Sequence, residues 1–117
     1  MDIIYRSKNV EKQCRDLKKA QKDFASFGEK IIAKINLIES MNSFSDIMNY
    51  SPFHCHKLSG KLKDYWSIYV NGRKCSLRMI IAPVDDNGQI VASDYDFANT
   101  CKLLNIVLIE EVSNHYE

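Results

Sequence analysis

The amino-acid sequence predicts an α+β fold in which two or three N-terminal helices pack on one face of a small, mostly antiparallel β-sheet. Apolar residues recur at helical spacing from Val10 to Met41. After Pro52 the period changes to that of a strand, and Asn71-Gly72 lies between two alternating runs. With 117 residues and a hydrophobic fraction of 45%, the chain is predicted to be a single globular domain over residues 1–117.

The N-terminal segment predicts a short strand followed by a helix. Residues 2–6 are β-branched and aromatic enough for a strand. Residues 10–24 then show three-, four- and seven-residue steps between apolar positions, which indicate an amphipathic helix. The apolar positions of this helix are Val10, Cys14, Leu17 and Phe24.

Two further helices are predicted before Pro52. Ser26 and Glu29 fit a capping box, in which the Ser26 hydroxyl accepts from an orphan amide and Glu29 reaches back. The helix behind this cap is expected to pack against the first as a hairpin joined near Ala25. Residues 43–46 repeat the capping pattern and predict a short third helix that ends before Pro52. The apolar stripe of the second helix is Phe27, Ile31, Ile35, Ile38 and Met41.

Asn71-Gly72 predicts a β-hairpin, because both residues of a tight two-residue turn need positive φ. In that register one face is mostly apolar and is expected on the helices. It pairs Val70 with Arg73, Ile68 with Cys75 and Trp66 with Leu77. The other face is aromatic, hydroxylic and cationic, and pairs Tyr69 with Lys74, Ser67 with Ser76 and Tyr65 with Arg78. A slip by one residue would reverse the faces of one strand.

The remainder of the chain predicts a turn, a long connection and a last strand. Residues 83–88 read as the turn, and the acidic stretch from there to Thr100 as a long loop. Residues 102–113 are predicted to form the final strand. Its apolar run 105–109 suits a position at the centre of the sheet.

Charge is nearly balanced overall, at +1, but it is unevenly distributed. Residues 57–78 hold six basic residues and one acidic residue and carry +5, whereas residues 79–117 hold one lysine and seven acids and carry −6. A neutral protein with such segregation can present a strongly positive face. The near-zero total therefore does not exclude a nucleic-acid binder.

Absent motifs exclude several classes of site. The sequence has no glycine-rich phosphate loop, no G-x-S-x-G nucleophile elbow and no paired acidic motif of a metal-dependent nuclease. The one local concentration of metal ligands is His54-Cys55-His56, and alternation along a strand would turn Cys55 away from both histidines. The cysteines lack paired spacing, and no apolar run approaches the ~20 residues that cross a bilayer, so a cytoplasmic protein without membrane association is predicted.

Three features carry possible chemistry: the basic segment 56–63, the cationic and aromatic hairpin face, and the terminal residues 115–117. Each alone is typical of ordinary protein surface. Together, tyrosines and arginines on a sheet offer stacking platforms for unpaired bases, and neighbouring lysines can hold phosphates. A histidine within reach titrates near neutrality and can exchange a proton.

Two segments resemble a known family. Residues 57–72, K-L-S-G-K-L-K-D-Y-W-S-I-Y-V-N-G, are similar to the L-x-G…W-S-I-x-V-N segment of the HigB toxins. Residues 109–117, I-E-E-V-S-N-H-Y-E, resemble the ending (I/V)-x-E-(I/V)-S-x-H-Y that a branch of that family carries. HigB proteins belong to the RelE/ParE superfamily, the toxic halves of bacterial type II toxin–antitoxin pairs. The order of two helices followed by a sheet also matches a RelE-like fold.

The sequence departs from the family pattern in two places. Many relatives have an aromatic-Arg pair soon after Asn-Gly, where this chain has Arg73-Lys74-Cys75. The family's strand arginine therefore maps to Arg73 or to Arg78. The loop 84–100 is longer than in the shorter relatives.

The resemblance implies a ribosome-dependent mRNA endonuclease that uses no metal and no cofactor. Attack of the ribose 2′-OH on the adjacent phosphorus would leave a 2′,3′-cyclic phosphate and a 5′-OH. His115 is the first candidate for acid or base, with Tyr116 stacking or sharing the proton transfer, and His56 is the second. Charge stabilisation is expected from Lys57, Arg73 and Arg78. The residues expected to bind RNA are Lys61, Lys63, Tyr65, Tyr69 and Lys74.

The resemblance also implies partners. The expected partners are a cognate HigA-like helix-turn-helix antitoxin, mRNA in the ribosomal A site and ribosomal RNA, with operator DNA reached only through the antitoxin complex. Two other functions remain open at this stage. One is ParE-like, non-catalytic inhibition of DNA gyrase, and the other is a non-catalytic module that binds RNA or protein.

Overall fold

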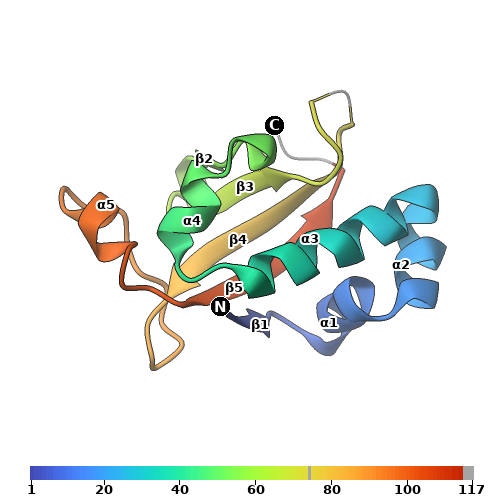
Figure 1. Ribbon diagram of the computed structural model, residues 1–117, viewed down its shortest axis with the longest axis horizontal. Helices are drawn as coiled ribbons and strands as arrows, with labels where there is room; N and C mark the ends of the chain where they lie inside the picture. Colours follow the sequence, from blue (N-terminus) through green and yellow to red (C-terminus); the bar gives the residue numbers. More distant parts are fainter. Residues whose placement is uncertain (74, 115–117) are drawn as a thin grey trace.

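The computed structural model describes residues 1–73 and 75–114, and these form an α+β fold around a five-stranded sheet (Figure 1). The strand order is β1-β5-β4-β3-β2. β1 runs parallel to β5, and the other neighbouring strands are antiparallel. The strands are β1 (Asp2–Tyr5), β2 (His56–Lys57), β3 (Trp66–Tyr69), β4 (Arg78–Val84) and β5 (Ile106–Ser113). The predicted fold class is confirmed.

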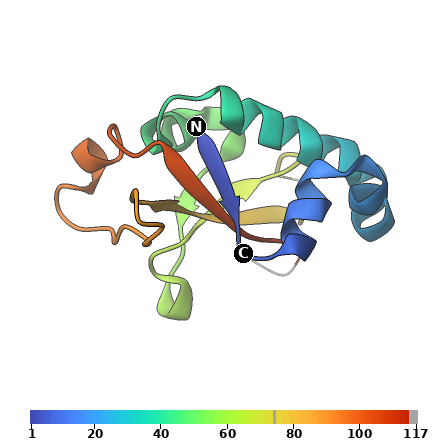
Figure 2. The ribbon, with the colours of Figure 1, turned by 90° about the horizontal axis from the view of Figure 1, so that it is seen from below.

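The N-terminal helices lie on one face of the sheet. Figure 2 shows α3 and α4 on one side of the strands, whereas the yellow-green turn η3 protrudes on the other side. The helices are α1 (Lys8–Arg15), α2 (Leu17–Phe24), α3 (Gly28–Ser40), α4 (Phe44–Asn49) and α5 (Phe97–Thr100). Three short 3₁₀ turns complete the order: η1 (Ala25–Phe27), η2 (Ser51–Phe53) and η3 (Gly60–Leu62).

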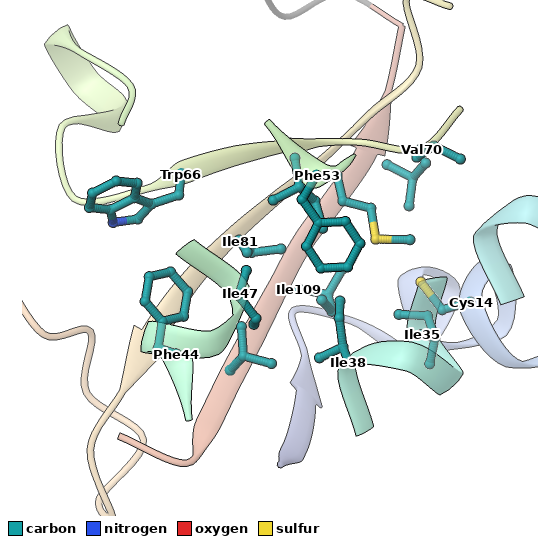
Figure 3. Close-up of a cluster of buried hydrophobic side chains, with 14 of the residues drawn as sticks. Cys14, Ile35, Ile38, Phe44, Ile47, Phe53, Trp66, Val70, Ile81 and Ile109 are labelled. Atoms are coloured by element: carbon teal, nitrogen blue, oxygen red, sulfur yellow. The ribbon is translucent and has the colours of Figure 1, made fainter. Parts of the chain in front are cut away.

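The hydrophobic core fills the layer between helices and sheet (Figure 3). Ile31, Ile35 and Ile38 of α3 are fully buried, which confirms most of the stripe predicted from their spacing. They meet alternate residues of the strands, such as Ile81 and Ile109. Burying one side chain of this size contributes about 1.5–3 kcal/mol.

The predicted single helix over 10–24 is two helices in the structure. Asp16 has extended backbone angles, φ −107° and ψ 113°, and it ends α1. Its carboxylate then accepts a hydrogen bond from the amide of Lys18 and so caps α2. Val10 and Cys14 are buried as expected, but the change of direction leaves Leu17 42% exposed. The prediction for Leu17 was therefore wrong.

The link between α2 and α3 also differs in detail. The hairpin does turn at Ala25, whose φ of 54° reverses the chain. However, Ser26 is taken up by η1, and α3 begins at Gly28 with no side-chain cap, so the predicted capping box with Glu29 does not form. A Cβ on Gly28 would lie 2.9 Å from the backbone of Ala20, so the two helices touch closely there.

The third predicted helix, by contrast, is confirmed with its cap. Residues Ser43 and Asp46 form a capping box at the start of α4, with both of its hydrogen bonds present. The helix ends at Asn49, before Pro52.

The predicted hairpin register was wrong by four residues. Trp66 pairs with Ile81 and Tyr69 with Arg78, so residues 70–77 form a longer connection in place of a two-residue turn. All seven residues of β4 are buried, and six of them are apolar. Pairing β3 with the polar segment directly after Gly72 would bury much less apolar surface, so the register with β4 is favoured. An even shift keeps the side chains of β3 and Arg78 on their predicted faces, so Arg78 still lies beside a tyrosine, Tyr69 in place of Tyr65.

The connection between β4 and β5 covers residues 85–105, so it is slightly longer than predicted, and it is more ordered, because it contains a turn and the short helix α5. Pro83 and Val84 belong to β4, and the turn occupies residues 85–88. Phe97 of α5 stacks on Trp66, with ring centroids 5.5 Å apart and planes 6° apart, which anchors the connection to the core. β5 begins at Ile106 rather than at residue 102, and β4 rather than β5 is the middle strand.

Candidate active site

Polar side chains gather on the face of the sheet opposite the helices, here called the second face. The register places them in two rows that cross the strands. One row contains Tyr69, Arg78 and Ser113. The next row contains His56, Ser67, Ile80 and Glu111.

Arg78 is the most unusual residue of the second face, because its cation is buried. The residue is 8% exposed, and its guanidinium carbon lies 3.8 Å from the centroid of the Tyr69 ring. One terminal nitrogen donates to the carbonyls of Cys75 and Leu77, the latter at 3.0 Å. Its Nε is buried without a hydrogen-bond partner within residues 1–73 and 75–114. The described carboxylates form no ion pair with Arg78.

Within the described part of the chain, the buried Arg78 guanidinium has no counter-charge, which leaves an unmet electrostatic requirement. Removing a cation from water costs several kcal/mol unless an anion or a set of hydrogen bonds compensates it. The Tyr69 ring and two carbonyls compensate part of this cost. An anion with oxygens in a fork-compatible geometry, such as a phosphate, would compensate the rest.

Two histidines lie beside the same tyrosine. The ring centroids of His54 and Tyr69 are 4.8 Å apart with planes at 31°, and those of His56 and Tyr69 are 6.4 Å apart with planes at 79°. The backbone of His54 is left-handed, with φ 46° and ψ 47°, at the end of η2. This turn brings His54 back toward Tyr69, while His56 begins the edge strand β2.

One hydrogen bond fixes the tautomer of His56. Its Nδ1 lies 3.0 Å from the carbonyl oxygen of His54. A carbonyl oxygen only accepts hydrogen bonds, so Nδ1 must carry the hydrogen. The neutral ring then has its lone pair on Nε2, which makes His56 a proton acceptor with a defined reactive atom.

Ser67 adds a further polar group to this region. Its side chain is fully buried, and its hydroxyl has no hydrogen-bond partner among the described residues. It pairs directly with His56 across β2 and β3. The cluster of His54, His56, Tyr69 and Arg78, with Ser67 beneath it, therefore combines two titratable imidazoles with a buried cation.

The structure brings three of the predicted site residues together: His56, Tyr69 and Arg78. Lys57 lies in the row of Trp66, which belongs to the helix side. Arg73 is exposed in the connection 70–77, and Lys61 and Lys63 are exposed at η3. Lys74, His115 and Tyr116 fall outside the described residues.

Tyr65 belongs to a separate cluster on the second face. Arg6 forms hydrogen bonds of 2.8 to 3.1 Å with the carboxylate of Glu110 and one of 3.2 Å with the Tyr65 hydroxyl. Burial raises the pKa of Glu110, but hydrogen bonds from Arg6 and Tyr65 outweigh it and hold that pKa below its ordinary value. Burial, together with the Glu110 carboxylate, raises the pKa of Tyr65. A cavity of about 450 Å³ adjoins Arg6 and is also lined by Ile4, Gln89, Ile90 and Leu108.

Sequence reasoning missed His54. It considered this residue only as a possible metal ligand beside Cys55, although alternation already placed His54 and His56 on one side. The signal that could have found it is the His-x-His spacing read as a proton-transfer pair. No group of three or more His, Cys, Asp or Glu residues in the described part of the chain could hold a metal ion.

Comparison with known proteins adds no relative. No protein-family model matches this chain, and no curated protein matches it. Over residues 1–73 and 75–114, no helix has the length and apolar character needed to cross a membrane. Function must therefore be argued from the two sequence motifs and from the geometry of the cluster.

Proposed function

We propose that this chain is the toxin of a type II toxin–antitoxin system, similar to HigB, and that it cuts mRNA on the ribosome in the cytoplasm without a metal ion. The observation that carries the proposal is Arg78, a buried guanidinium on the Tyr69 ring that no described carboxylate neutralises, with His56 against the same ring. A phosphodiester supplies the missing anion, and an adjacent imidazole supplies the proton transfer that its cleavage needs.

The proposed reaction is attack of a ribose 2′-OH on the neighbouring phosphorus. His56 Nε2 takes the 2′ proton, because its Nδ1–H is held by the carbonyl of His54. Arg78 stabilises the negative charge that develops on the phosphorane oxygens. The products are a 2′,3′-cyclic phosphate and a free 5′-OH.

RNA would reach the cluster along the second face. Lys61 and Lys63 are exposed at η3, on the side of the sheet away from the helices. Their charges lie in the segment 57–78 that carries +5 and could hold the phosphates of a single strand. Tyr65 lies on the same face with its hydroxyl bound to Arg6.

The remaining assignments follow from the family resemblance. His115 and Tyr116 are proposed to contribute to proton transfer or stacking, and Lys57, Arg73 and Lys74 to charge stabilisation or RNA binding. The partners proposed are a HigA-like helix-turn-helix antitoxin, mRNA in the ribosomal A site and ribosomal RNA. Operator DNA would be reached only through the antitoxin complex.

The test is induction of the protein in bacteria with mapping of mRNA 5′ ends. Wild type is expected to arrest growth and to create new 5′-OH ends within translated codons. Arg78→Gln and His56→Gln are expected to lower cleavage by about 10²-fold or more, since each removes a group that acts in the transition state. Lys30→Gln, which removes one exposed charge from α3, is the matched control and should cut as wild type does.

Growth arrest with intact message, unchanged in both variants, would overturn the nuclease proposal. A supercoiling assay on the same cells would then show whether DNA gyrase is the target. Purified protein that neither arrests growth nor alters supercoiling, but still binds RNA, would indicate a non-catalytic module.

A further inference from the structure

We propose that His54 is a second catalytic residue, whose protonated ring gives a proton to the departing 5′-oxygen while His56 takes the proton of the 2′-OH. This inference rests on the proposed nuclease function. It assigns the two halves of the proton transfer to two residues only two positions apart, both of them against the Tyr69 ring.

The placement of His54 argues for a role other than packing. Its side chain is exposed, although it lies 4.8 Å from Tyr69, so a substrate on the second face can reach the ring. Its φ of 46° falls in the left-handed region, which glycine and asparagine adopt readily and histidine rarely does. Non-glycine residues held in that region concentrate at functional sites, where the surrounding structure maintains them.

The hydrogen bond between His56 and His54 decides which ring accepts a proton and which donates one. His56 has its Nδ1–H committed to the His54 carbonyl, so its Nε2 lone pair is set up to accept. Among the described residues, the ring of His54 is not held by a hydrogen bond and can rotate to present a protonated nitrogen. Cleavage needs both functions, and a single imidazole cannot be neutral and protonated at the same time.

The charged and titratable groups that share the Tyr69 ring with His54 come from three strands, and one further cation, on α3, lies on the helix side near Phe53. Tyr69 approaches from β3, His56 from β2, and Arg78 from β4 across the Tyr69 ring. Lys34 of α3 lies 5.9 Å over the ring of Phe53, the residue before His54. A phosphate bound at Arg78 would therefore adjoin the same Tyr69 ring that both imidazoles contact.

The step balances as follows. The 2′ O–H bond breaks and its proton passes to His56 Nε2, while the 2′-oxygen forms a bond to phosphorus. The bond from phosphorus to the 5′-oxygen breaks, and the proton of His54 passes to that oxygen. His56 ends protonated and His54 neutral, and exchange with water restores both for the next cycle.

The first measurement is the pH profile of cleavage by purified protein on ribosomes programmed with a short message. Activity requires neutral His56, which is favoured as pH rises, and protonated His54, which is favoured as pH falls, so wild type gives a bell. His54→Asn keeps the left-handed backbone and the carbonyl that holds His56 but lacks the imidazole. It is expected to lose about 10²-fold or more at the optimum and to lose the alkaline limb.

The second measurement replaces the leaving group. A message with sulfur in place of the 5′-oxygen at the cleaved bond releases a thiolate, which departs without a proton donor. His54→Asn is expected to cut this message within about tenfold of wild type, while His56→Gln stays impaired on both messages. Thermal unfolding of His54→Asn is the control for an intact fold. His54→Gly also tolerates a φ of 46°, so it replaces His54→Asn in both measurements if that variant does not fold.

The outcomes separate the two proposals. His54→Asn that cuts the natural message as wild type does would overturn the role of His54 and leave the nuclease function standing. Equal impairment on both messages would also overturn it, because a positioning role does not depend on the leaving group. Wild type that cuts neither message would overturn the nuclease function itself.

Discussion

At the scale of single residues, Arg78 shows which features of a side chain a sequence can identify. Its place beside a tyrosine on one face of the sheet was predictable. Side chains alternate between the two faces of a strand, so a register error of four residues, an even number, leaves each paired side chain on the same face. The burial of Arg78 was not predictable, since this depends on how the chain before β4 folds back and brings the carbonyls of Cys75 and Leu77 to the guanidinium. His54 escaped prediction because its left-handed backbone is set by η2 rather than by a local motif.

Glu110 gives a prediction at the same scale. Its pKa is held below the ordinary value of 4.5, so the contact with Arg6 stabilises the fold fully above that pH and is lost as the pH falls through the lowered pKa. We expect Glu110→Gln to cost up to about 1 kcal/mol at neutral pH, because Arg6 is half exposed and solvent screens the pair. The difference from wild type in urea unfolding should shrink as the pH falls from about 5 to about 3.

Arg6→Leu is the reciprocal variant for this pair. It should show the same loss at neutral pH and the same convergence with wild type in acid, because it breaks the same contact from the other side. A difference that stays constant with pH would contradict the assignment of the effect to the carboxylate of Glu110.

Whole elements were predicted where their signals were local. The capping box of α4 and the stripe of α3 needed only sequence spacing, and both are present. The end of α1 at Asp16 and the start of α3 at Gly28 depend on how the helices meet, which no local pattern encodes. The hairpin register depends on the burial of β4 between β3 and β5, a property of the finished sheet.

The contact between α2 and α3 gives a prediction for these elements. A methyl group on Gly28 would lie 2.7 Å from the Gln21 amide nitrogen and 2.9 Å from the Ala20 carbonyl carbon, so the helices must separate to admit it. We expect Gly28→Ala to lower the free energy of unfolding by about 1–3 kcal/mol, which exceeds the gain in helix propensity of up to about 1 kcal/mol. Urea unfolding measures this, and the exposed neighbour Glu29→Ala should stay within about 0.5 kcal/mol of wild type.

At the scale of the whole molecule, the distribution of charge matters more than its sum of +1. The helices cover one face of the sheet, and η3 protrudes on the other (Figure 2). Tyr69 and Arg78 pair with each other on this second face, and Lys61 and Lys63 are exposed at η3. The prediction that segment 57–78 gives the second face a positive surface stays a prediction, which rests on the exposed Lys61 and Lys63.

Salt dependence of RNA binding tests this arrangement. A plot of log affinity for single-stranded RNA against log salt concentration has a negative slope. If Lys61 and Lys63 each neutralise one phosphate, this slope should be less steep by about 1.4 in Lys61→Gln/Lys63→Gln. The charge-matched control Lys18→Gln/Lys30→Gln, on α2 and α3, should keep the wild-type slope. Equal slopes for the two double variants would show that the lysines at η3 do not contact the RNA backbone.

The position of β5 has a consequence for the timing of synthesis. β1 is the first of the five strands to be translated and β5 the last, yet β5 lies between β1 and β4 and pairs Val107 with Ile3. At about 5–20 residues per second, roughly 5–20 s pass between the synthesis of β1 and that of its partner β5, and β4 keeps one edge unpaired until β5 has been made. A nascent chain therefore has an interval before the sheet closes. During it, chaperones or a binding protein meet an unfinished sheet, and a chain interrupted before residue 106 would carry an exposed edge prone to aggregation.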